Sequence, residues 1–107
     1  MGRKRPFEYE IQYTKAADKF LKAHEEIRKQ YEEAIHELLL GDHPEKVDVK
    51  RIQGKWQDVY RIRLGSIRLV YTIIEGKIVV IKTLLASPRG GVYKKINGLK
   101  LINLVNI

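Results

Sequence analysis

Cysteine is absent from the sequence, which excludes disulfides, thiolate nucleophiles and cysteine-based zinc sites. Long apolar runs are absent too, since none approaches the roughly 18 residues of a membrane-spanning helix. A basic trio at residues 3–5 is followed by Pro6-Phe7-Glu8 and not by the apolar core of a secretory signal. We therefore expect a cytoplasmic protein with no membrane partner.

Acidic residues are scarce in the second part of the chain. Residues 1–45 hold 8 Lys+Arg and 10 Asp+Glu, a net charge of −2, whereas residues 46–107 hold 13 and 3, a net charge of +10. Such a surplus attracts polyanions, because Lys and Arg displace counterions from phosphates. The charge alone fits either a nucleic-acid partner or a basic surface that keeps the protein soluble without a dedicated ligand.

Histidines are few, and their spacing matches no metal-ligating pattern. His24 and His36 lie within a predicted helical stretch, and no H-x-x-x-H motif occurs around them or around His43. The acids of the connection at residues 42–48, Asp48 included, are interpreted as solvated loop residues. The sequence therefore predicts no metal ion and no cofactor.

One folded domain is predicted over residues 1–107, because the chain is too short for two domains and contains no repeat or Gly/Ser-rich linker. Residues 1–6 are interpreted as a basic tail. The apolar C-terminal segment at residues 97–107 fits a last helix, an added edge strand or an apolar tail, and the sequence leaves these three alternatives open.

Apolar periodicity predicts a strand followed by helix. Aromatic and aliphatic residues alternate with polar ones over residues 7–13, which is typical of a half-buried strand. Apolar residues then recur at helical spacing over residues 17–39, with Thr14 as a suitable N-cap and Gly41 at the end. Whether this helical stretch breaks near His24 is left open.

Three strand-like blocks follow at residues 58–64, 67–74 and 77–84. Gly65-Ser66 and Glu75-Gly76 separate them and are short enough for tight hairpins. The resulting order is β-α-α-β-β-β. It predicts an α+β fold with an antiparallel-rich sheet and two N-terminal helices packed on one face.

Arg61, Arg63 and Arg68 are predicted to share one face of the sheet. Strand alternation separates them from Ile62, and a two-residue turn places Arg63 opposite Arg68. Like charges directly opposite each other destabilise a sheet, and the guanidinium fork suits phosphate, so a bound anion is favoured. The alternative is an arginine face that is solvated or paired with local acids. Those acids are Asp58, Glu75 and the carboxylates of the helices.

Several motifs accompany these arginines. They are Ile52-Gln53-Gly54-Lys55-Trp56, Tyr60-Arg61-Ile62-Arg63-Leu64-Gly65, Arg68-Leu69-Val70-Tyr71, and the late Arg89 and Val92-Tyr93. Together with the order of elements, they resemble the RelE/ParE superfamily of small toxins from bacterial and archaeal toxin–antitoxin pairs, over roughly residues 7 to 95. The RelE branch, which this chain resembles more, cuts mRNA in the ribosomal A site. The ParE branch inhibits DNA gyrase without cutting RNA.

The resemblance implies a set of catalytic residues and a set of RNA-binding residues. Arg61 and Arg63 match basic positions at the scissile phosphate, Arg68 matches the arginine that holds it, Arg89 resembles a late basic residue, and the Tyr93 ring positions the mRNA. The RNA-binding candidates are Lys50, Arg51, Lys55, Lys94 and Lys95. Some members have lysines where this chain has arginines, and an arginine is almost never deprotonated, so Arg63 is not expected to abstract a proton.

For the RNA cleavage that the resemblance implies, the expected chemistry is metal-independent attack of the RNA 2′-hydroxyl on its own phosphate. Positioning and charge stabilisation need only well-placed cations. Residues 46–107 contain no histidine, which leaves proton transfer to Lys55, Tyr93, solvent or the ribosome.

The function expected from the sequence is a ribosome-dependent mRNA endonuclease toxin. The alternatives are a non-catalytic gyrase inhibitor and an inactive RNA-binding homologue. The expected partners are a cognate antitoxin, the ribosome and mRNA, with operator DNA reached only through the antitoxin.

Overall fold

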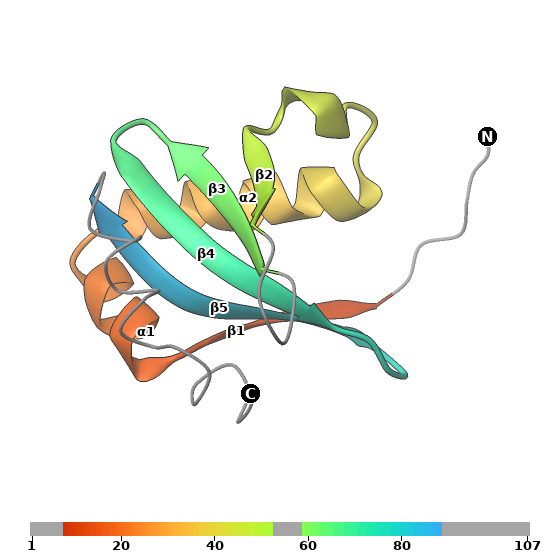
Figure 1. The fold of residues 1–107 in the computed structure, drawn as a ribbon, viewed down its shortest axis with the longest axis horizontal. Helices are drawn as coiled ribbons and strands as arrows, with labels where there is room; N and C mark the ends of the chain where they lie inside the picture. The colour runs from red at the N-terminus through yellow and green to blue at the C-terminus, as the bar shows by residue number, and fades with distance from the viewer. Residues whose placement is uncertain (1–7, 53–58, 89–107) are drawn as a thin grey trace.

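The computed structural model describes residues 8–52 and 59–88 (Figure 1). Its elements are β1 (Tyr9–Tyr13), α1 (Lys15–Lys22), α2 (Glu25–Leu40), the 3₁₀ turn η1 (Pro44–Lys46), β2 (Val49–Ile52), β3 (Val59–Leu64), β4 (Ile67–Ile74) and β5 (Val79–Pro88). Within these residues, no helix combines the length and apolarity needed to cross a membrane.

The strands form one mixed sheet in the order β1-β5-β4-β3-β2. The pair β1–β5 is parallel and the other pairs are antiparallel. Both helices lie on one side of the sheet (Figure 1), which confirms the predicted α+β fold. We call the opposite side, on which no helix of residues 8–52 and 59–88 packs, the open face.

The predicted order of elements was one strand short, because the connection after α2 contains β2. This strand lies at the sheet edge, and its two aliphatic residues, Val49 and Ile52, flank Lys50 and Arg51. A short, charged edge strand lacks the period-2 alternation by which strands are recognised. Its pairing with β3 defines it instead.

The helical stretch does break near His24, and the result is two helices. The Thr14 hydroxyl accepts a hydrogen bond from the Ala17 amide at 3.2 Å and donates one to the Leu84 carbonyl at 2.7 Å, so it caps α1 and ties it to β5. At the break, the His24 ring stacks on Phe20 with centroids 4.1 Å apart. Helix α2 ends at Leu40 with Gly41 as its C-cap, which agrees with the end that the sequence predicted.

The turn at Gly65-Ser66 has the predicted register, with Leu64 opposite Ile67 and Arg63 opposite Arg68. Gly65 has a φ of 62°, a conformation that favours glycine.

The next connection is longer than predicted. It spans residues 75–78 and not only Glu75-Gly76, and β5 runs from Val79 to Pro88 where residues 77–84 were expected. The start of β5 coincides with its parallel pairing to β1, in which Tyr9 lies opposite Val79. Its extended end pairs with the start of β4, where Ile67 lies opposite Pro88.

The main core lies between the helices and the sheet. Its largest buried side chains are Leu21, Tyr31, Ile35, Ile62, Leu69 and Ile81. One polar contact crosses it: the Tyr31 hydroxyl lies 2.7 Å from the Thr83 hydroxyl, and both residues are 0% exposed. This hydrogen bond joins α2 to β5 and leaves neither hydroxyl unpaired in the core.

Replacing Tyr31 with Phe is expected to lower the free energy of unfolding by about 1–2 kcal/mol, because it leaves the Thr83 hydroxyl buried without its partner. Urea denaturation of the variant measures this loss. Thr83→Val in the Tyr31→Phe background is expected to cost less than the two single losses combined, since no orphaned hydroxyl remains. An unchanged denaturation midpoint in Tyr31→Phe would contradict the assignment.

Candidate nucleic-acid interface

Three arginines lie on the open face, as the sequence predicted. Ile62 points into the core beneath the helices, so its neighbours Arg61 and Arg63 belong to the opposite side of β3. Arg68 lies directly across the ladder from Arg63. We call Arg61, Arg63 and Arg68 the arginine cluster.

The candidate RNA-binding residues of β2 are divided between the two faces. Lys50 is exposed and lies opposite Arg61, so it joins the arginine cluster on the open face. Arg51 lies opposite Tyr60, which packs against the helix-side core, so its register position is on the helix side. The remaining candidates lie outside the described residues. They are Lys55, Arg89, Tyr93, Lys94 and Lys95.

The three arginines differ in their access to solvent. The Arg63 side chain is 48% exposed, and Arg68 is partly buried. The Arg61 side chain is only 9% exposed, and its buried Nε has no hydrogen-bond partner among residues 8–52 and 59–88. Arg61 lies opposite Val70, a member of a small apolar cluster on the open face that also contains Val59. A buried cation with an unpaired donor is costly unless an anion compensates it.

Asp48 is an exposed residue of the connection before β2, as the sequence predicted, and it also contacts two members of the arginine cluster, which the sequence did not predict. Its Oδ2 accepts a hydrogen bond from Arg63 Nε at 2.6 Å, and its Oδ1 lies 3.8 Å from Arg61 Nη2. Its carbonyl oxygen also accepts the Arg63 amide at 3.0 Å.

The acids named from the sequence as possible partners of the arginines are not the one that the structure places against them. Asp58 lies outside the described residues, Glu75 lies in the turn beyond the opposite end of β4 from Arg68, and the helices cover the other face. Asp48 was missed because β2 was missed. Once β2 is paired with β3, the residue before Val49 lies opposite Arg63.

The arginine cluster keeps a surplus of positive charge. Together with Lys50 it brings four cations to one region, and Asp48 is the carboxylate that the described residues place against them. Arg68 Nη1 reaches the Gly65 carbonyl at 3.5 Å, a long contact that leaves most of its donors for other acceptors. This region therefore suits a phosphate group of an extended polyanion.

Tyrosines on the helix side are poor candidates for proton transfer at this face. Burial raises the pKa of Tyr31 and of Tyr71 above the usual value for a tyrosine. Both side chains belong to the core beneath the helices. The described part of the open face thus offers charge and positioning, and any tyrosine acting there must come from elsewhere in the chain.

Residues 8–52 and 59–88 contain no group of three His, Asp or Glu side chains that could hold a metal ion.

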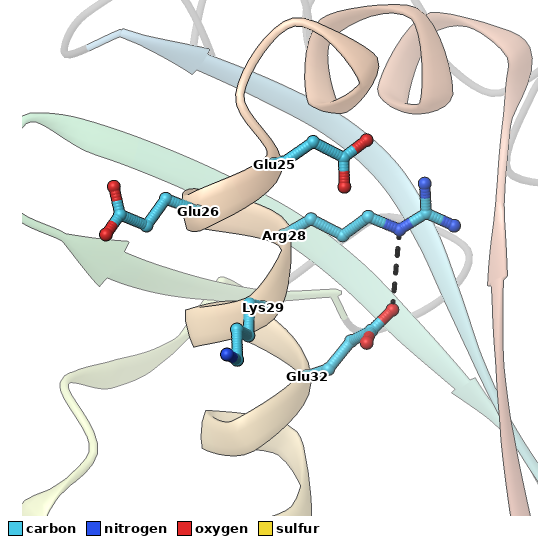
Figure 2. Close-up of a pocket in the computed structure, with 5 residues that line it drawn as sticks. All are labelled: Glu25, Glu26, Arg28, Lys29 and Glu32. Atoms are coloured by element: carbon cyan, nitrogen blue, oxygen red, sulfur yellow. Dashed lines mark hydrogen bonds and ion pairs between the residues drawn. The ribbon is translucent and has the colours of Figure 1, made fainter.

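A surface pocket on α2 of about 440 Å³ has a different character (Figure 2). It is lined by Glu25, Glu26, Arg28, Lys29 and Glu32. Arg28 Nε donates to Glu32 at 3.5 Å, and the guanidinium lies 4.8 Å from the centroid of the Tyr13 ring. Because Arg28 already has these partners and three of the five lining residues are acidic, the pocket suits a phosphate group less well than the arginine cluster does.

Comparison with known proteins gives three consistent findings. The family model for the ParE toxin of type II toxin-antitoxin systems, parDE, matches residues 11–87. The putative toxin RelE1 of Methanocaldococcus jannaschii is 37% identical over 68 residues, which cover 62% of this chain and 72% of that protein.

The third finding is structural. A chain in the crystal structure of the RelB-RelE antitoxin-toxin complex from Methanococcus jannaschii is similar, with a TM-score of 0.52 and 26% identity, covering 78% of this chain and 96% of that chain. The residues matched by the family model include both helices, Lys50, Asp48 and the whole arginine cluster.

Arg68→Ala is expected to weaken binding of a single-stranded RNA oligonucleotide and to reduce the slope of log K against log salt by about 0.7, the effect of one lost phosphate contact. Fluorescence anisotropy at several salt concentrations measures both. Lys77→Ala is the matched control, because it removes one charge from the exposed turn at the far end of β4. Equal losses in the two variants would show that only net charge matters.

Proposed function

This chain belongs to the RelE/ParE superfamily of toxins from type II toxin–antitoxin systems, and we propose that it inhibits translation by cutting mRNA in the ribosomal A site. The observation that carries the proposal is the arginine cluster, which faces away from the helices with more positive charge than Asp48 can neutralise. The names of the relatives support it, since two of them are RelE toxins.

The proposed reaction uses the RNA's own 2′-hydroxyl. Its oxygen attacks the adjacent phosphorus, the bond to the 5′-oxygen breaks, and a cyclic phosphate remains on the upstream product. Negative charge grows on the phosphoryl oxygens as the reaction proceeds. Arg63 and Arg68 stabilise this charge, and their fixed positions across the β3–β4 ladder hold the phosphate in line.

Further groups complete this proposal. Arg61 adds positive charge beneath the phosphate, and Arg89 adds a late basic group. Tyr93 stacks on a base or assists proton transfer, with Lys55, solvent and ribosomal groups as the other routes for protons. Lys50 holds the flanking RNA backbone together with Lys55, Lys94 and Lys95. The reaction needs no metal ion, because cations from the protein provide the charge.

The proposed partners follow from the same assignment. The similar solved structure is an antitoxin–toxin complex, and we propose that a cognate antitoxin binds this chain and blocks access to the arginine cluster. The ribosome and mRNA are the targets, operator DNA is reached only through the antitoxin, and the site of action is the cytoplasm.

A second candidate function is inhibition of DNA gyrase without RNA cleavage. It is favoured by one observation, that the matching family model describes ParE toxins. In that case the arginine cluster would bind a protein or DNA surface. Topoisomer profiles of a plasmid in induced cells separate the two, because supercoiling is affected by gyrase inhibition and not by mRNA cleavage.

Expression in a bacterial translation extract is expected to produce mRNA 5′ ends at the A-site codon of stalled ribosomes. Arg68→Ala should reduce these cuts by at least tenfold, because it removes one of the two arginines that stabilise the phosphoryl charge. Lys77→Ala should leave them unchanged. Mapping of 5′ ends measures the cuts, and intact mRNA with continuing translation would contradict the endonuclease assignment.

A further inference from the structure

We propose that Asp48 is a positioning residue for the arginine cluster: it fixes Arg63 through Nε and supplies the counter-charge for buried Arg61, so that the terminal nitrogens of Arg63 are held toward the phosphate. This inference rests on the proposed function, because the contact between Arg63 and the phosphate matters only in the proposed cleavage reaction. A phosphate-binding site is expected to consist of cations, and Asp48 is a carboxylate within this one.

The contact with Arg63 has the geometry of an orienting interaction. Asp48 meets Arg63 twice, through its carbonyl oxygen at 3.0 Å from the backbone amide and through Oδ2 at 2.6 Å from Nε. The second is a short, charge-assisted hydrogen bond. A guanidinium has five N–H donors, and a bond at Nε leaves the four donors of the terminal nitrogens. The arginine is thus held by its inner edge while its outer edge stays available.

This ion pair contributes little to folding. The Asp48 side chain is 43% exposed and that of Arg63 is 48% exposed. Solvent screens a pair of this kind, and such pairs add little stability. Orientation of Arg63 is the effect that remains, and displacements of about 1 Å in a catalytic site are enough to cost about a hundredfold in rate.

The contact with Arg61 has a different basis. Asp48 Oδ1 lies 3.8 Å from Arg61 Nη2, which is too long for a hydrogen bond but close enough for strong attraction between a buried cation and a carboxylate. Arg61 Nε is buried and has no partner in the described part of the chain, so the described residues compensate this guanidinium incompletely. The two oxygens of Asp48 therefore serve two arginines, and each oxygen faces a different member of the cluster.

Asp48 also lowers the charge of the site by one, which opposes RNA binding. If affinity alone mattered, a neutral residue would serve better. A positioning role therefore predicts a split: loss of the carboxylate leaves RNA affinity unchanged or slightly higher and lowers the rate of cleavage. A residue that acts only through charge would change affinity and leave the rate of the bound complex unchanged.

The experiment compares Asp48→Asn, Asp48→Glu and Asp42→Asn in the full chain. Asp42→Asn is the matched control, because it removes one charge from an exposed residue of the same connection. Asp48→Glu keeps the counter-charge that Arg61 needs and moves the carboxylate by one methylene, so it tests position if the Asn variant fails to fold. Single-turnover cleavage on programmed ribosomes gives the rate, and mRNA with a 2′-O-methyl group at the target codon gives the affinity.

We expect at least a tenfold lower cleavage rate in both Asp48 variants, with affinity equal to that of the original chain or up to a fewfold tighter. Asp42→Asn should keep the original rate. In ¹⁵N-arginine spectra, the Arg63 Nε–H resonance, assigned with Arg63→Lys, should shift and exchange faster in Asp48→Asn but not in Asp42→Asn. An unchanged rate or an unchanged resonance in Asp48→Asn would overturn the proposal.

The experiment distinguishes failure of the proposed endonuclease function from failure of the Asp48 proposal. If the original chain does not cut mRNA, the endonuclease assignment fails whatever the variants do. The Arg63 resonance then still decides whether Asp48 holds this arginine, because it is measured on the free protein. If the resonance responds to Asp48→Asn in a chain that does not cut RNA, the positioning role in cleavage is overturned and only the structural contact stands.

Discussion

The pairing of β3 with β4 decides which side chains reach which face of the sheet. The hairpin turns at Gly65, whose positive φ permits a two-residue connection, and its register sets Arg63 directly opposite Arg68. Side chains alternate along each strand, so the same register sends Ile62 and Leu69 into the core. A slip of one residue would exchange the two sets, placing arginines beneath the helices and aliphatic residues outside.

Stability and function are therefore divided between the two faces. On the helix side, aliphatic packing and the Tyr31–Thr83 hydrogen bond join α2 to the sheet. On the open face, Arg61 is buried, its Nε has no partner among the residues that the structure describes, and Arg63 lies across from another arginine. Such arrangements oppose folding, and proteins tolerate them at sites that bind or react. In this protein, the packing of the helix-side core offsets the free-energy cost of the arginine arrangement.

Sequence patterns were sufficient where the local signal was strong, as in the Gly65-Ser66 hairpin and the shared face of the three arginines. They failed where tertiary pairing decides. Strand β2 has its aliphatic residues three apart and is defined by its ladder with β3, so both this strand and the contacts of Asp48 with the arginines were missed. Strand β5 starts later than predicted, at the residue where its parallel pairing with β1 begins, and no local sequence motif predicts that pairing. Arg51 was predicted as an RNA-binding residue, and its register position, opposite Tyr60, is on the helix side of the sheet. The roles of Arg89 and Tyr93 stay predictions.

In the proposed reaction, the arginine cluster holds the phosphate that is cut. A structure of this protein on a ribosome, with mRNA blocked by a 2′-O-methyl group at the A-site codon, tests it most directly. We expect the guanidinium groups of Arg63 and Arg68 to lie within hydrogen-bond distance of the oxygens of the phosphate that follows the blocked sugar. A complex in which the open face points away from the mRNA, or in which another surface meets that phosphate, would contradict it.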